Sequence, residues 1–216
     1  MTSGAEARIS VAQLEADLRH LVRIAGAIAG SPEGQVRAVM SEALGEVDPV
    51  AVEEIILQSF LFAGFPRVLN AMRAWRAVSG VPAPVEDIEG SVDDFDLWRK
   101  RGEETCAIIY GESYEKLREN IRGLHPALDD WMIVDGYGRV LSRPGVSLRA
   151  RELCVVAACA TTGQQRQLHS HLHGALNAGA PAGEVAAALD ALTDLISRDD
   201  LSRYRQLLVK VVGEGE

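Results

Sequence analysis

Apolar residues recur at helical spacing along most of the chain. Between about residue 8 and residue 80, Ala, Leu, Val, Arg and Glu dominate, and apolar positions return every third or fourth residue, as in amphipathic helices. Breaks at Gly30-Ser31-Pro32, Asp48-Pro49 and Gly64-Phe65-Pro66 divide this region, because glycine and proline interrupt helical hydrogen bonding. The pattern predicts about four helices there.

The helical pattern returns from Leu97 onward. Pro144-Gly145 and Gly179-Ala180-Pro181 are breaks, and the hydroxyl of Ser147 is a candidate N-cap for the helix that follows it,. No convincing pair of strands occurs, so we predict an all-α fold. The predicted helices begin near Leu97, Glu112, Pro126, Leu148, Gln164, Ala182 and Asp199.

The segment between the two helical regions is rich in acidic residues. Residues 80–96 contain Pro82, Pro84 and six acidic residues without a clear period, which is typical of an exposed linker. We therefore predict a first helical repeat at residues 1–80, an acidic connector at 81–96 and a second helical repeat at 97–216.

An internal repeat is suggested by comparing the two regions. Residues 19–49 align with residues 151–181 at seven identities in 31 positions. Two Ala-rich helical segments can also match this well through composition alone. We predict a tandem duplication in which each copy is a helical hairpin followed by a helix that starts near a proline, and in which the copies stack on each other.

Composition limits the classes of partner. The 216 residues are 47% hydrophobic and 25% charged, which is ordinary for a folded soluble protein,. With 22 Lys and Arg against 31 Asp and Glu, the net charge of -9 disfavours nucleic acids and anionic membranes,. The N-terminal sequence lacks a signal-like apolar run, and the odd number of cysteines, three, suits a reducing compartment,. We expect a cytoplasmic protein whose cysteines are thiols.

One segment of the second region combines several short motifs. They are Arg101-Gly102, Tyr110-Gly111, Tyr137-Gly138-Arg139-Val140, Arg143-Pro144-Gly145, Arg151-Glu152-Leu153 with the apolar helix to Ala160, and the run from Gln167 to Pro181 with Glu184. Together they resemble the carboxymuconolactone decarboxylase and alkylhydroperoxidase D superfamily over roughly residues 101–192. The end of single-copy members of that superfamily is similar to Glu53-Glu54-Ile55, Ala63-Gly64-Phe65-Pro66 and Leu69-Asn70-Ala71. The resemblance implies an alkylhydroperoxidase D-like helical fold.

The paired cysteines of the peroxidase branch are missing from this segment. In that branch the motif is Glu, eleven residues, Cys-x-x-Cys, three residues, His, and its thiol pair performs disulfide exchange. Counted from Glu152, the thiol positions fall on Gln164 and Gln167, and the histidine is His171. Because glutamine cannot form a disulfide, we predict that this peroxidase mechanism is absent. Cys154 and Cys159 are expected to be packing residues.

Glu152 and His171 are the candidate acid and base. His171 lies at the margin of the predicted apolar face of its helix, where an imidazole would be half-buried,. The alternatives are a salt bridge for Glu152 and a structural hydrogen bond for His171. Tyr137 is a third candidate catalytic residue that could line a pocket with His125 and Trp131, although helical aromatic residues usually pack in the core.

No cofactor or metal is predicted. His169 and His173 share a helix face,, but no third ligand lies at a compelling spacing from them. An anionic substrate would need a nearby cation, and Arg139, Arg149 and Arg151 are candidates for it. The alternative for each is an ordinary arginine on the protein surface.

The resemblance implies a decarboxylase-like enzyme that acts on a small lactone or carboxylic acid by acid/base chemistry. Two alternatives remain at this stage: a thiol antioxidant protein, which would require acidic and exposed cysteines, and a non-catalytic ligand-binding relative. The resemblance also implies a homo-oligomer, and a duplicated chain favours a trimer. The expected partner is a small-molecule substrate.

Overall fold

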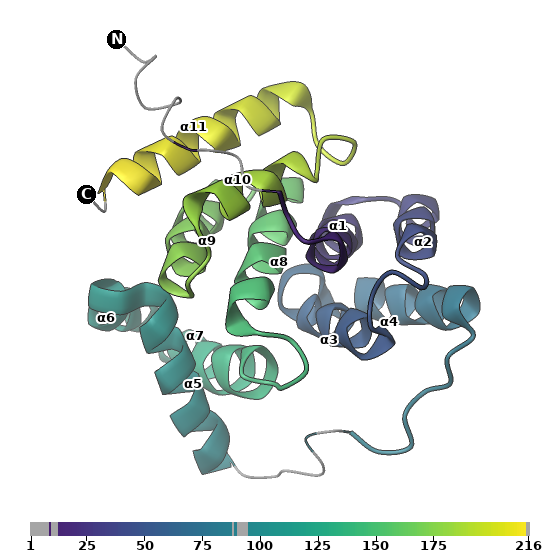
Figure 1. Ribbon diagram of the computed structural model, residues 1–216. Coiled ribbons are helices and arrows are strands. Elements are labelled where there is room, and N and C mark those ends of the chain that lie inside the picture. The colour runs from purple at the N-terminus through teal and green to yellow at the C-terminus, as the bar shows by residue number, and fades with distance from the viewer. Residues whose placement is uncertain (1–8, 10–12, 88, 90–94, 215–216) are drawn as a thin grey trace.

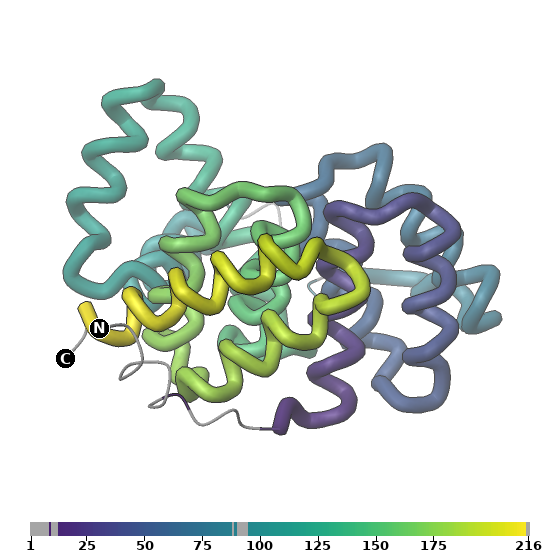
Figure 2. Tube along the Cα trace, turned by 90° about the horizontal axis from the view of Figure 1, so that it is seen from above, coloured from purple at the N-terminus to yellow at the C-terminus, as the bar shows by residue number. Residues whose placement is uncertain are grey.

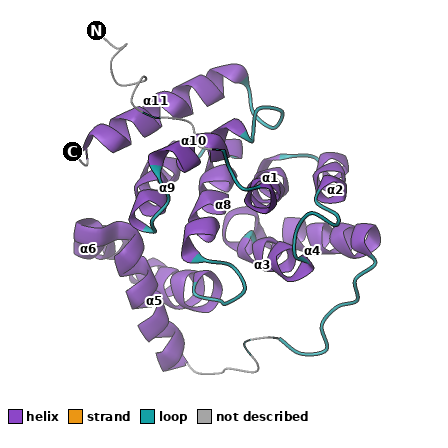
Figure 3. Cartoon of the chain, in the orientation of Figure 1, coloured by secondary structure: helices purple, strands orange, loops and turns teal. Residues whose placement is uncertain are grey.

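All regular secondary structure in the described part of the chain is helical. The computed structural model describes residues 9, 13–87, 89 and 95–214. Loops and turns join the helices, and no strand occurs among these residues (Figure 3). The predicted all-α fold class is therefore confirmed.

The first region forms four helices, as predicted, and the first two predicted breaks separate helices. The third predicted break lies inside the fourth helix, whereas the third and fourth helices are separated at Ser59, which the sequence did not indicate. Asp48 accepts a hydrogen bond from the backbone N–H of Val50 at 3.0 Å, and Pro49 occupies the first helical position, where its missing N–H costs nothing. Gly64 interrupts the fourth helix with a φ of 72°. The helices are α1 (Ala16–Gly30), α2 (Glu33–Glu42), α3 (Pro49–Gln58) and α4 (Phe60–Ser79).

The second region begins with α5, and every predicted helix start lies within two residues of an observed one. The side chain of Ser147 accepts a hydrogen bond from the N–H of Ala150 at 3.3 Å, as expected of an N-cap. The sequence did not indicate η3, a π-helical segment that continues α7. The elements are α5 (Phe95–Tyr110), η2 (Gly111–Ser113), α6 (Tyr114–Leu124), α7 (Pro126–Trp131), η3 (Met132–Leu141), α8 (Leu148–Thr161), α9 (Gln165–Asn177), α10 (Ala182–Asp190) and α11 (Arg198–Glu214).

Helix α8 occupies the centre of the fold. It packs against α1 on one side and α9 on another, while α11 covers α9 and α10 (Figures 1 and 2). Every residue from Ala150 to Ala160 is buried, and a helix surrounded in this way is a core helix rather than an amphipathic surface helix. Side chains from both regions contribute to one continuous hydrophobic core around it.

A buried ion-pair network joins the two regions. Arg151 of α8 is fully buried and donates to Glu54 of α3 at 2.9 Å, to Gln58 at 3.2 Å and to the carbonyl oxygen of Arg143 at 3.0 Å. Arg143 also binds Glu54, at 2.9 Å, and reaches Asp87 of the connector at 2.6 Å. Burial lowers the pKa of Arg151, and the partner Arg143 lowers the pKa of Asp87. The network fixes α8 against α3.

The helix starts agree with the alignment of the two regions. Helices α1, α2 and α3 begin at residues 16, 33 and 49, and α8, α9 and α10 begin at residues 148, 165 and 182. The two triplets are thus in nearly constant register, although the duplication and the three segment boundaries remain predictions. Residues 1–8 and 10–12 of the first segment, residues 88 and 90–94 of the connector and residues 215–216 of the second segment lie outside the described residues.

No single helix of the described residues is long and apolar enough to cross a membrane. Helices α3 and α4 together have sufficient length and apolar character, but the chain bends by 118° between them.

Two glycines allow α5 and η3 to cross in close contact. A Cβ atom built on Gly102 would lie 2.0 Å from the carbonyl oxygen of Ile133, and one on Gly138 would lie 2.0 Å from that of Trp98. Backbone atoms cannot move aside as a flexible side chain can. We therefore predict that Gly138→Ala lowers the free energy of unfolding by about 3 kcal/mol or more, measured by urea denaturation.

Gly123→Ala is the matched control, because it adds a methyl group to another helix where no atom lies within 4 Å. It should leave stability unchanged or raise it by about 0.5–1 kcal/mol. Equal losses in the two variants would contradict the close-crossing argument.

A second prediction concerns the buried network. Replacing Glu54 with Gln removes the carboxylate from a fully buried guanidinium, and stranding a buried charge costs about 3–5 kcal/mol. The neighbouring Glu53 pairs with Arg76 at 2.5 Å in a more exposed position, so Glu53→Gln should cost only about 1 kcal/mol or less. Chemical denaturation of both variants tests the difference, and equal costs would show that the Arg151 contact contributes little.

Candidate active site

Glu152 and His171 form a direct pair in the interior. Oε2 of Glu152, on α8, lies 2.8 Å from Nδ1 of His171, on α9. The exposed fractions of the side chains are 0% and 7%, so His171 is more buried than the half-buried position that the helical pattern predicted. When Glu152 is ionised, Nδ1 carries the shared proton, so Nε2 is a proton acceptor in the neutral imidazole and a proton donor in the imidazolium.

The second oxygen of Glu152 is unusual. Its Oε1 is buried and has no hydrogen-bond partner among the described residues, a situation that costs about 1–3 kcal/mol. Gly174 makes room for the carboxylate, since a Cβ atom there would lie 2.6 Å from Oε2 and 2.7 Å from Cγ2 of Ile109. Such a costly arrangement is common at functional sites.

Aromatic rings from distant parts of the chain enclose the imidazole. The ring of Phe62, on α4, lies 6.2 Å from that of His171 in an edge arrangement, and the ring of Tyr110, on α5, lies 6.4 Å away. Sequence reasoning assigned neither residue to the site, although Tyr110 belongs to a stretch that carried the family resemblance and Phe62 directly precedes another. The site therefore draws side chains from both regions of the chain.

Tyr137 lies behind Tyr110 rather than against the pair. Its hydroxyl donates to the hydroxyl of Tyr110 at 3.3 Å. Burial raises the pKa of Tyr137 well above its usual value and that of Tyr110 to about 12, so both phenols keep their protons near neutral pH. Because Tyr110 accepts from Tyr137, its own proton is available to donate onward.

The thiol chemistry of the peroxidase branch has no equivalent here. Gln164 and Gln167, at the two thiol positions, are exposed. Cys106, Cys154 and Cys159 are free and buried. Burial raises the pKa of Cys106 and of Cys159 to about 12, and raises that of Cys154 further. Since the thiolate is the reactive form, none of these cysteines is activated.

Two further aromatic candidates lie away from the pair. Nδ1 of His125 accepts a hydrogen bond from the N–H of Ala127 at 3.1 Å and so caps α7. Trp131 has an exposed fraction of 60%. Neither contacts Glu152 or His171 in the structure, so the suggestion that they line a pocket with Tyr137 is not supported.

The three arginines proposed to bind an anion are already engaged. The Arg139 guanidinium lies over the ring of Trp98 at 5.2 Å, and Arg149 pairs with Glu184 at 3.1 Å. Arg151 is fully buried against Glu54. The alternative prediction, that Arg151 is a surface residue, was therefore wrong. None of the three forms a hydrogen bond or ion pair with Glu152 or His171 among the described residues.

A pocket of about 910 Å³ lies between α3, α4 and the connector. Apolar side chains such as Leu57, Leu69 and Met72 line much of it, and Arg143 forms part of its wall. Neither Glu152 nor His171 lines it. Of the arginines that line it, Arg76 and Arg143 pair with carboxylates, and Arg73 donates a hydrogen bond to the side chain of Asn70.

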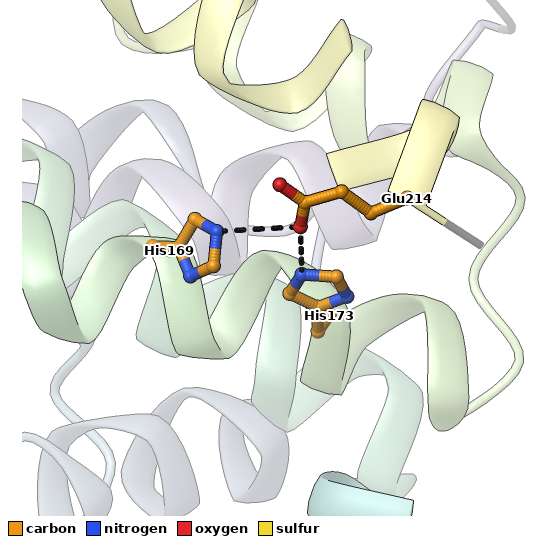
Figure 4. A group of neighbouring side chains, drawn as sticks. All are labelled: His169, His173 and Glu214. Carbon is orange, nitrogen blue, oxygen red and sulfur yellow. Dashed lines mark hydrogen bonds and ion pairs between the residues drawn. The ribbon is translucent and has the colours of Figure 1, made fainter. Parts of the chain in front are cut away.

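The other histidines of α9 lie on its outer face. His169 and His173 face α11, where Glu214 approaches both imidazoles (Figure 4). Glu214 is thus a third potential ligand beside the two histidines. Glu214 is 41 residues from His173, so no local spacing in the sequence indicated it.

Fold and site together define an all-helical protein with an internal carboxylate–imidazole pair suited to proton transfer. Comparison with known proteins shows what it resembles. The model of the carboxymuconolactone decarboxylase family matches residues 130–195, which include Glu152, His171 and Tyr137. The chain is similar to this family over that segment. It is also similar to Peroxisomal protein 2 of Schizosaccharomyces pombe, at 27% identity over 180 residues that cover 81% of this chain and 84% of that protein.

The burial of the cysteines leads to a direct test. We predict that the three thiols of the native protein react with a chromogenic disulfide reagent at pH 7.5 more than about tenfold more slowly than those of the urea-unfolded chain. The kinetics are followed by absorbance with both samples at the same pH. Rapid modification of one native thiol would revive the thiol antioxidant hypothesis.

Proposed function

We propose that this protein is a small-molecule enzyme of the carboxymuconolactone decarboxylase type, in which Glu152 and His171 transfer protons. The 2.8 Å contact between two buried ionisable groups is the observation that carries the proposal. Protein interiors bury such groups at a cost, and the unpaired Oε1 of Glu152 adds to it. A purely structural role would favour a fully satisfied carboxylate.

The proposed reaction is the loss of carbon dioxide from a small lactone acid. The bond between the carboxylate and its neighbouring carbon breaks, carbon dioxide leaves, and the electron pair remains on the substrate as an enolate. A protonated His171, held in orientation by Glu152, then delivers a proton to that carbon through Nε2. The Tyr110 hydroxyl, which accepts from Tyr137, is suited to donate a hydrogen bond that stabilises the enolate oxygen. Tyr137 acts as a positioning residue, since its hydroxyl donates to Tyr110.

The thiol alternative is less well supported, because every cysteine is buried and has a raised pKa. A non-catalytic ligand-binding role remains the competing hypothesis for the same site. We further propose a homo-oligomer, with a trimer favoured by the family resemblance. Phe65 and Leu69 of α4, with exposed fractions of 63% and 50%, are apolar surface available for such contacts. The cytoplasmic location is likewise proposed.

We expect wild-type protein to release carbon dioxide from at least one member of a lactone-acid panel. Glu152→Gln and His171→Gln should each lower kcat by about 100-fold or more, because general acid/base groups contribute about 10²–10⁴ to rates. Release of labelled carbon dioxide measures the reaction. Circular dichroism and thermal unfolding confirm that each variant is folded.

The matched controls are Glu115→Gln, on the exposed surface of α6, and His125→Asn, which keeps a side chain able to cap α7,. Both should retain wild-type rates. If turnover persists in Glu152→Gln and His171→Gln, the pair is not the proton-transfer site. If the panel binds without turnover, the ligand-binding hypothesis is favoured, whereas peroxide turnover that depends on cysteine would favour the thiol hypothesis.

A further inference from the structure

Three histidines alternate along α9, and the helix directs them to two different environments. Residues two apart point to opposite sides of a helix, while residues four apart share a face. His171 accordingly points inward to Glu152. The rings of His169 and His173 lie beside each other on the outer face, with centroids 5.0 Å apart.

Helix α11 brings a carboxylate to this outer pair. Oε2 of Glu214, the last residue of α11, lies 3.7 Å from Nε2 of His169 and 3.2 Å from Nε2 of His173 (Figure 4). Both imidazoles thus direct the same nitrogen atom toward one carboxylate oxygen. The three ligand atoms all lie within 4.8 Å of one another.

The separations suit a transition metal. Zn²⁺ binds imidazole nitrogen and carboxylate oxygen at about 2.0–2.2 Å in tetrahedral geometry, which places neighbouring ligand atoms roughly 3.3 Å apart. The distances of 3.2 and 3.7 Å from Glu214 bracket that value. The two imidazole nitrogens lie within 4.8 Å of each other, so binding an ion would require them to approach by at most about 1.5 Å. Partly exposed side chains can make such a movement.

We propose that His169, His173 and Glu214 bind a divalent transition metal, with Zn²⁺ as the representative ion. Two imidazoles and one carboxylate form a donor set that suits zinc better than magnesium, which prefers oxygen ligands. Water completes the coordination at this solvent-accessible position. The bound ion links the last turn of α11 to α9 on the face opposite His171. The site is separate from the proposed proton-transfer pair and does not depend on its activity.

The test uses the full-length chain after treatment with a chelator. Titration with Zn²⁺ in competition with a chromogenic chelator should give one ion per chain, and Mg²⁺ should not compete. His169→Asn, His173→Asn and Glu214→Gln should each weaken zinc binding by more than about tenfold, since losing a group that merely orients a ligand already costs about 10–100-fold. Hydrogen exchange in the last turn of α11 should slow on zinc addition in the wild type only.

His125→Asn and Glu115→Gln, which alter the same residue types elsewhere, should bind zinc as the wild type does. The three ligand positions are partly or largely exposed, so their variants are expected to fold, which circular dichroism verifies. No zinc binding by the wild type would show that the cluster is a hydrogen-bonded group only. Unchanged affinity in all three ligand variants would place the ion elsewhere, and either result overturns the proposal.

Discussion

Two consecutive charged residues without exposed surface, Arg151 and Glu152, fix the arrangement of the fold around α8. Neighbouring residues on a helix point about 100° apart, so each charge needs its own partner from a different direction. Arg151 is neutralised by Glu54 of α3, and Glu152 shares a hydrogen bond with His171 of α9. Because an unpaired buried charge is very costly, displacement of either neighbouring helix carries a large penalty.

The candidate site follows from the same constraint. A carboxylate in the core has little competition from water, so its interaction with the imidazole is stronger than at the surface. Phe62 and Tyr110 exclude solvent further, and Tyr110 and Tyr137 retain their protons through burial. In this chain, exposed glutamines occupy the positions that correspond to the thiols of the peroxidase branch, which leaves proton transfer as the chemistry that these residues support.

The sequence predicted the features that depend on short-range interactions along the chain. Proline and glycine breaks and the Ser147 cap placed the helices closely, and the spacing from Glu152 to His171 identified residues that do meet. Features that depend on the tertiary structure were not predictable. The full burial of Arg151 requires Glu54 from 97 residues away, and Glu214 reaches the outer histidines only because α11 folds back across α9 (Figure 2). The π-helical geometry of η3 likewise had no recognised local signal.

The contact of Phe62 with His171 suggests that the two regions have different roles in the site, one supplying its wall and the other its acid/base groups. If they descend from a duplicated unit, the ancestor had two equivalent sites, and the first region now carries His20 and Val39 where the second carries Glu152 and His171. On that history, the first region lost its acid/base pair but still supplies the Phe62 ring, which packs against His171 in the remaining site. Selection on it would then preserve shape rather than acid/base chemistry, and neither region could be dispensed with while the other kept its function.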